Sequence, residues 1–158
     1  MAEKINIITS ASREDQYLNL IPQMSSLLAG ESDPIANMAN ISSAIKETFG
    51  FLWVGFYRVV QDELVLSPFQ GKIACTRIKY GKGVCGTAWK EAQTQIVADV
   101  NLFEGHITCD AESVSEIVVP IIRDNKVVAV LDIDSEYADH FSEIDSKYLN
   151  QITDMLRF

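Results

Sequence analysis

Three cysteines are the side chains of this 158-residue chain best suited to covalent chemistry. Cys75 and Cys109 lie in polar loop sequence, whereas Cys85 lies near a helix start and suits packing as a small apolar side chain. In thiol redox chemistry one thiolate attacks an oxidised substrate and a second thiol closes a disulfide, so two cysteines are the minimum. An odd number of cysteines does not describe a structural disulfide framework, and packing, metal binding and redox chemistry all stay open here.

A zinc site is one alternative use of these side chains, with Cys75, Cys85, His106 and Cys109 as its ligands. Structural zinc usually takes two close-spaced pairs of ligands, and only His106 and Cys109 form such a pair here. The spacing therefore disfavours zinc, and we expect no metal site. We interpret His106 as a loop or hydrogen-bonding histidine rather than as a ligand or a base.

Carboxylates form a second group of residues with chemical potential. Asp132 and Asp134 follow an apolar strand and, because strand side chains alternate, are predicted to share a face with Val128 and Val130. Glu116 lies on the partner strand of the same predicted hairpin. Three carboxylates converge if the two faces coincide; otherwise all three face solvent. A convergent group would bind an ammonium group, or would keep one carboxyl protonated as an acid through like-charge repulsion.

Two aromatic residues of the first predicted strand are a further candidate for a binding site. Trp53 and Tyr57 are four residues apart, so they lie on one face of the strand and could form an aromatic wall. Ordinary core packing explains the same spacing equally well.

The segment from Gly81 to Gly86 matches the G-x-G-x-x-G pattern of dinucleotide-binding proteins, with Asp99 at a plausible distance for a ribose contact. The context disfavours that interpretation, because residues 75–80 are too polar for a buried parallel strand and the helix that follows is short. We interpret the pattern as a glycine turn that leads into a helix over about residues 84–92.

Helix signals occur in three other places. Ser12 is the N-cap of a first helix, which Pro22 is expected to break or kink. Asp33 is the N-cap of a second helix that ends at Gly50, and Ser142 begins the last helix.

Strand signals come in pairs. Residues 51–60 and 64–69 are predicted to form one hairpin, and residues 115–123 and 126–134 a second one, with a short strand at residues 95–98. Hairpins grouped in this way indicate an α+β fold, a central antiparallel sheet flanked by helices. The remaining residues up to 114 lack periodicity, which in a compact domain is typical of a functional loop.

Composition limits the classes of function. The length fits one domain over residues 1–158, and the formal net charge of −9 argues against nucleic acid and anionic membranes as partners. The first residues lack the features of a signal peptide, and the apolar runs are too short to cross a membrane. We therefore expect a cytoplasmic protein.

Three stretches of the chain together resemble the free methionine-(R)-sulfoxide reductases, a family whose members consist of a lone GAF domain. The stretches are residues 74–78 with 81–88, residues 105–110 with 115–118, and residues 130–135. The resemblance runs from about Ile35 to the carboxyl terminus and implies a single GAF domain with residues 1–30 as an N-terminal helical extension. One departure is Glu104, where proline is expected.

The resemblance also implies roles for individual residues. Cys109 would attack the sulfoxide sulfur, Cys75 would form the disulfide with Cys109, and Cys85 matches the third family cysteine. The implied substrate pocket is lined by Trp53, Tyr57, Glu116, Asp132 and Asp134.

The function implied by the resemblance is the thiol-dependent reduction of free L-methionine-(R)-S-oxide to methionine, with thioredoxin as the reductant and without a bound cofactor. The family also suggests a homodimer. The alternative is a noncatalytic GAF module that binds a small ligand or senses oxidants, and a weaker one is a thiol peroxidase.

Overall fold

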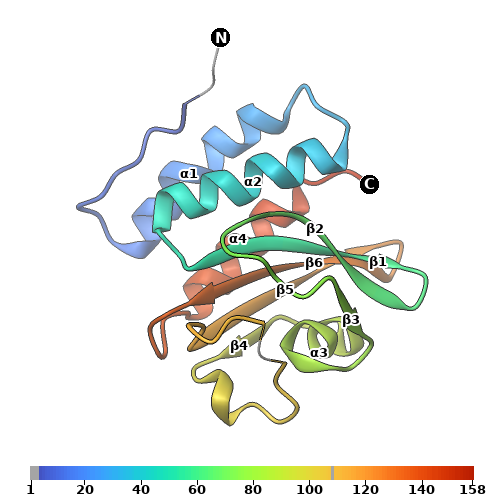
Figure 1. Cartoon of the computed structure of the whole chain (residues 1–158). Helices are drawn as coiled ribbons and strands as arrows, with labels where there is room; N and C mark the ends of the chain where they lie inside the picture. The colour runs from blue at the N-terminus through green and yellow to red at the C-terminus, as the bar shows by residue number, and fades with distance from the viewer. Residues whose placement is uncertain (1–3, 108) are drawn as a thin grey trace.

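The computed structural model describes residues 4–107 and 109–158 of the chain (Figure 1). Residues 1–3 of the expected N-terminal extension lie outside this part. The α-helices are α1 (Arg13–Leu28), α2 (Pro34–Phe49), α3 (Gly83–Glu91) and α4 (Glu143–Asp154), with a 3-10 turn at Val100–Leu102. The strands are β1 (Trp53–Val60), β2 (Glu63–Gln70), β3 (Arg77–Lys79), β4 (Gln95–Val97), β5 (Ser115–Arg123) and β6 (Lys126–Ser135).

The strands form a single antiparallel sheet with the order β3-β2-β1-β6-β5-β4. The two predicted hairpins, β1–β2 and β5–β6, are confirmed, and β1 pairs with β6 to join them at the centre of the sheet. This α+β arrangement agrees with the predicted fold class.

The helices divide between the two faces of the sheet. Figure 1 shows α1, α2 and α4 on one side and α3 on the other. The side chains of β1, β5 and β6 alternate between two apolar clusters, because successive residues of a strand point to opposite faces. Val54 and Ile117, for example, pack under the three helices, whereas Trp53 and Val118 pack on the side of α3. The second side carries the predicted site residues.

The helix ends follow the capping signals. Asp33 accepts hydrogen bonds from the backbone of the first turn of α2, and Gly50 ends that helix in the left-handed conformation, with φ of 69°. Ser142 and Asp145 form a capping box at the start of α4.

Of the two expected effects of Pro22, a break or a kink, the break is wrong, because α1 continues through Pro22 to Leu28. Proline removes one backbone N–H, and the carbonyl that would accept from it belongs to Leu18. Leu18 and Pro22 both lie on the exposed side of α1, where water can bond that carbonyl. Tyr17, Leu20 and Met24 are fully buried on the other side, and their burial stabilises the helix across the proline.

The shared face predicted for Val128 and Asp132 is also wrong. The register of β5 and β6 shifts between Ile121 and Ile122, which adds one residue to β6 near Val128. Val128 therefore packs on the helix side, whereas Val130 packs on the side of α3. The expected alternation holds only from Ala129 onward.

The strand β3 is absent from the predictions, because Arg77 and Lys79 are charged and exposed and only Ile78 is buried. It pairs with β2 as an antiparallel edge strand, and a turn at residues 80–82 leads from it into α3. A Cβ on Gly86 would come within 2.6 Å of the carbonyl oxygen of Lys79, so glycine lets the helix approach this strand. The prediction of a glycine turn that leads into a helix is confirmed.

In the part of the chain that is described, no helix is both long and apolar enough to span a membrane.

Candidate active site

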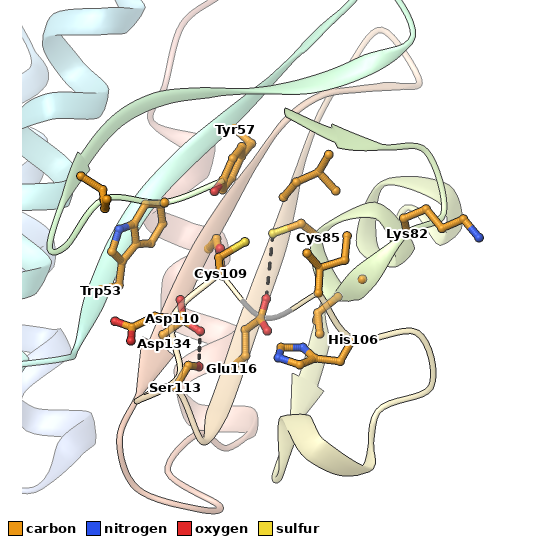
Figure 2. A pocket seen from close by; sticks show the side chains of 17 residues that line it. Trp53, Tyr57, Lys82, Cys85, His106, Cys109, Asp110, Ser113, Glu116 and Asp134 are labelled. Carbon is orange, nitrogen blue, oxygen red and sulfur yellow. Dashed lines mark hydrogen bonds between the residues drawn. The ribbon is translucent and has the colours of Figure 1, made fainter. Parts of the chain in front are cut away.

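A pocket opens on the sheet face that carries α3. It holds about 550 Å³ of empty space, part of which is open solvent. The lining includes Trp53, Tyr57, Cys85, His106, Cys109, Asp110, Ser113, Glu116, Asp132 and Asp134 (Figure 2). The structure thus brings all but one of the predicted site residues to one cavity, and the remaining one, Cys75, is bonded to Cys109.

Three carboxylates meet in this pocket because of the register of two neighbouring strands. Glu116 of β5 pairs with Asp134 of β6, and Asp132 lies two pairs further along the same ladder, opposite Val118. These side chains of β5 and β6 therefore lie on the same face of the sheet, and the three carboxylates converge.

Two of these carboxyls are deeply buried. The side chains of Glu116 and Asp132 are each 6% exposed. Burial raises the pKa of Glu116 well above its ordinary value, and the nearby Asp132 raises it further. Burial and the charge of Asp134 likewise raise the pKa of Asp132. These carboxyls can therefore hold protons at neutral pH.

Asp134 is less buried than Glu116 and Asp132. It accepts a hydrogen bond of 2.5 Å from the Ser113 hydroxyl. Burial raises the pKa of Asp134 to about 6, and the Ser113 hydrogen bond opposes that rise. This carboxyl is mostly ionised at neutral pH, so the pocket combines proton-holding and charged carboxyls.

Cys85 lies at the start of α3 and is 3% exposed. Its Sγ is 3.9 Å from Glu116 Oε1, and Figure 2 shows the two side chains facing one another. Burial and the charges of Asp132 and Glu116 raise the pKa of this thiol. Cys85 is therefore a neutral thiol and a poor nucleophile in this environment.

Cys75 and Cys109 form a disulfide with Cα atoms 5.5 Å apart. Cys75 lies in the loop between β2 and β3 and is half-buried, whereas Cys109 lies in the loop before β5 and is exposed. While this bond exists neither sulfur can ligate zinc, so the four-ligand zinc site is not available in this state.

Trp53 and Tyr57 stack with ring centroids 6.0 Å apart and form one wall of the pocket. The Trp53 indole donates a 3.0 Å hydrogen bond to the carbonyl of Lys72, and the Tyr57 hydroxyl donates a 3.1 Å bond to the carbonyl of Cys75. The aromatic pair thus holds the loop that carries one of the two redox cysteines.

The loop before β5 supplies pocket residues that sequence reasoning did not assign to the site. Asp110 Oδ2 and His106 Nδ1 are buried and have no hydrogen-bond partner among the described residues. Burial lowers the pKa of His106, which favours the neutral imidazole. A loop without periodicity offers no pattern for such residues, although both lie in the family-like segment 105–110 with Cys109.

Comparison with known proteins places the chain in a family. Residues 33–156 match the GAF domain family. GAF domain-containing protein A of Dictyostelium discoideum is 54% identical over 157 residues, which cover 99% of each chain. The free methionine-R-sulfoxide reductase of Escherichia coli strain K12 is 44% identical over 146 residues, 92% of this chain and 88% of the relative. The chain belongs to the free methionine-R-sulfoxide reductase family of GAF domains.

A solved structure supports the same assignment. The X-ray structure of free methionine-R-sulfoxide reductase from Neisseria meningitidis, in complex with its substrate, superposes with a TM-score of 0.92. The two sequences are 46% identical, and the match covers 96% of this chain and 93% of the other. The expected family and its α+β GAF fold are confirmed.

Proposed function

We propose that the protein reduces free L-methionine-(R)-S-oxide to L-methionine, with Cys109 as the nucleophile and Cys75 as the resolving thiol. The observation that carries the proposal is the Cys75–Cys109 disulfide at a pocket that holds buried carboxyls. Relatives named for this activity, at 44% and 40% identity, support the substrate class.

The first step needs both a nucleophile and an acid, because the sulfoxide oxygen is a poor leaving group until it is protonated. The reduced Cys109 thiolate attacks the sulfoxide sulfur while Glu116 or Asp132 protonates the oxygen. Methionine then leaves and Cys109 carries the oxygen as a sulfenic acid. The sulfoxide is reduced by two electrons, and Cys109 is oxidised by two.

The second step regenerates the thiols. The Cys75 thiol attacks the sulfenic acid, which releases water and forms the Cys75–Cys109 disulfide. A dithiol reductant such as thioredoxin then opens this bond by exchange and becomes a disulfide itself. The exposed Cys109 sulfur suits such an encounter, and the reducing cytoplasm supplies dithiols of this kind.

Selection of the free amino acid follows from the charge of the pocket. Asp134 and Asp110 line it with carboxylates that an ammonium group can pair with. The nitrogen of a methionine sulfoxide inside a protein is an uncharged amide, which cannot form this ion pair. The acidic pocket thus serves both proton donation and substrate choice.

A thioredoxin-coupled assay tests the proposal by following NADPH consumption with four oxidised substrates. We expect turnover with free methionine-R-sulfoxide, and little with the S epimer, with a peptide-bound sulfoxide or with peroxide. Cys109→Ser should abolish turnover, and activity that survives this substitution would overturn the assignment of the nucleophile. Inactivity on every sulfoxide, together with tight binding of another metabolite, would favour a sensor module instead.

A further inference from the structure

We propose that Cys85, Glu116 and Asp132 form a binding site for a thiophilic divalent cation such as Zn²⁺. The site is separate from the Cys75–Cys109 pair, and its occupancy blocks the pocket. The blocking of catalysis rests on the proposed function, whereas the binding of the cation does not. Among the ligands that the sequence first suggested for zinc, this site keeps only Cys85.

The geometry of the three side chains supports coordination. One potential ligand atom from each lies within 4.8 Å of the other two, and Cys85 Sγ is 3.9 Å from Glu116 Oε1. A tetrahedral zinc ion with one sulfur and two oxygen ligands holds these atoms about 3.6 Å apart, so small side-chain movements close the site. The ligands come from α3, β5 and β6, which are rigid elements.

A second observation is that one oxygen of this group is unsatisfied. Asp132 is only 6% exposed, and its Oδ1 has no hydrogen-bond partner among the described residues. None of the ion pairs found between described residues includes Glu116 or Asp132. A buried carboxylate needs a proton, a cation or hydrogen-bond donors, and a divalent cation would satisfy both carboxylates together.

Coordination has a chemical consequence for catalysis. The cation takes the place of the protons, because a zinc-bound thiol is a thiolate and the released proton goes to solvent. Three protein ligands leave a fourth position open toward the pocket, which water or a substrate group can fill. The loaded protein can no longer donate a proton from Glu116 or Asp132, so it is inactive until the cation leaves.

The disulfide form of the protein provides a clean test of binding, because Cys85 is its free cysteine. We would titrate this form with Co²⁺ and record the near-ultraviolet charge-transfer band that a thiolate–cobalt bond produces. The expected result is a band that saturates at about one Co²⁺ per chain and disappears when Zn²⁺ is added. Absence of the band, or an equal band in Cys85→Ser, would overturn the proposal.

Matched variants separate the ligands from the redox pair. Cys85→Ser should remove the band, and Glu116→Gln should weaken Co²⁺ binding at least tenfold by removing one charged ligand. The reduced Cys75→Ser/Cys109→Ser protein should bind Co²⁺ like the disulfide form, because Cys85 is its remaining thiol. Circular dichroism shows whether each variant is folded, and unaltered Co²⁺ affinity in folded Glu116→Gln would contradict the assignment.

Inhibition is measured separately, as the Zn²⁺ concentration that halves methionine formation in a single turnover of reduced protein without thioredoxin. Cys85→Ser should raise this concentration at least tenfold, and a chelator should restore the wild-type rate. Equal inhibition of Cys85→Ser and wild type would contradict the blocking role. Failure of the reductase activity itself leaves the Co²⁺ result intact, so the two proposals fail separately.

Discussion

Cys109 is exposed and Cys75 is half-buried beside the aromatic wall, although one disulfide joins them. This difference fits a nucleophile that meets substrate and reductant, and a second thiol that meets only the first. Cys85 is close to both carboxyls but is held neutral by burial and by their charges. The three cysteines therefore differ in their exposure and in the charges around them, and these differences suit them to different roles.

Replacement of the resolving thiol should separate the two chemical steps. Cys75→Ser should release about one methionine per protein in the first turnover and then stop as a Cys109 sulfenic acid, because no thiol is placed to condense with it. Mass spectrometry after dimedone treatment measures this species. Unimpaired multiple turnover with thioredoxin would instead identify Cys85 as the resolving thiol.

Removal of a buried proton donor should slow chemistry without preventing folding. Glu116→Gln should lower the single-turnover rate by about 10²- to 10⁴-fold, since the amide keeps the shape of the carboxyl but cannot supply its proton. Asp124→Asn is the matched control, because Asp124 lies in the exposed β5–β6 turn with φ of 49°. An equal rate for Glu116→Gln and wild type would exclude Glu116 as the donor.

At the residue scale, alternation along strands predicted that Asp132 and Asp134 share a face, but it left open whether Glu116 converges with them. The bulge near Val128 was not readable, because it arises from the pairing with β5 and not from residue type. Asp110 was not assigned either, because its burial depends on how a loop folds back over the sheet.

Side chains of β1 hold the β2–β3 loop in position. Its carbonyls at Lys72 and Cys75 accept hydrogen bonds from the two aromatic side chains, and Lys72 forms an ion pair with Glu112 of the loop before β5. Both ends of that ion pair are about half exposed, so we expect it to contribute little to stability. The aromatic hydrogen bonds are the contacts that fix the β2–β3 loop on β1.

A glycine of this loop makes room for the aromatic wall. Gly71 has φ of 143°, and a Cβ there would lie 2.5 Å from Trp53 Cδ1. Gly71→Ala should therefore displace the indole, lower the free energy of unfolding by about 1–3 kcal/mol and raise KM roughly tenfold. Steady-state kinetics and urea unfolding measure both quantities.

Gly30→Ala is the control for this change. No atom lies within 4 Å of a Cβ at Gly30, and its φ is not in the left-handed region. This variant should stay within about 0.5 kcal/mol of wild type with KM unchanged. An unaltered KM in Gly71→Ala would show that the indole does not contact the substrate.

At the element scale, capping residues and hairpin turns predicted the longer elements, because those signals are local. The predicted break at Pro22 did not occur, since burial of the apolar side of α1 outweighs one lost backbone hydrogen bond. The edge strand β3 was missed because two of its three residues are charged and exposed, so it does not read as a strand.

A partly buried polar network connects elements on the helix side of the sheet. The Tyr17 hydroxyl donates a 2.8 Å hydrogen bond to Asp145 Oδ1, and Arg13 lies 3.6 Å from the same oxygen. Arg13 is also 2.9 Å from His140 Nε2, while the other ring nitrogen of His140 is 2.5 Å from Ser135 Oγ. The network links α1 and α4 to Ser135, the last residue of β6, which directly follows Asp134 of the pocket.

This network predicts a pH dependence of stability. Burial, and then the charge of Arg13, lower the pKa of His140 below its ordinary value of 6.5, against the opposing charges of Asp145 and Glu136. Protonation therefore favours the unfolded chain, and the contribution of His140 is present above the ordinary pKa and lost as pH falls through the folded pKa.

Urea unfolding from about pH 7.5 to about pH 5 measures this contribution. His140→Gln should be less stable than wild type at the upper pH, because it loses the ring contacts, and the difference should shrink as pH falls. The other titratable groups are the same in both proteins, so the difference in stability isolates the effect of His140. A constant or growing difference would show that His140 does not control this pH dependence.

At the scale of the molecule, the sequence indicated an α+β fold but not the strand order. The pairing of β1 with β6 joins segments about 75 residues apart, and no local pattern identifies such partners. That pairing creates the pocket, because it places Trp53 opposite Asp134.

The most direct test of the account is a single turnover of fully reduced protein with free methionine-R-sulfoxide and no recycling reductant. Methionine and free thiols are counted together, and the disulfide is mapped by mass spectrometry. We expect about one methionine per chain, a loss of two thiols, a Cys75–Cys109 disulfide and a Cys85 that can still be alkylated after denaturation. No methionine, or a disulfide that includes Cys85, would contradict it.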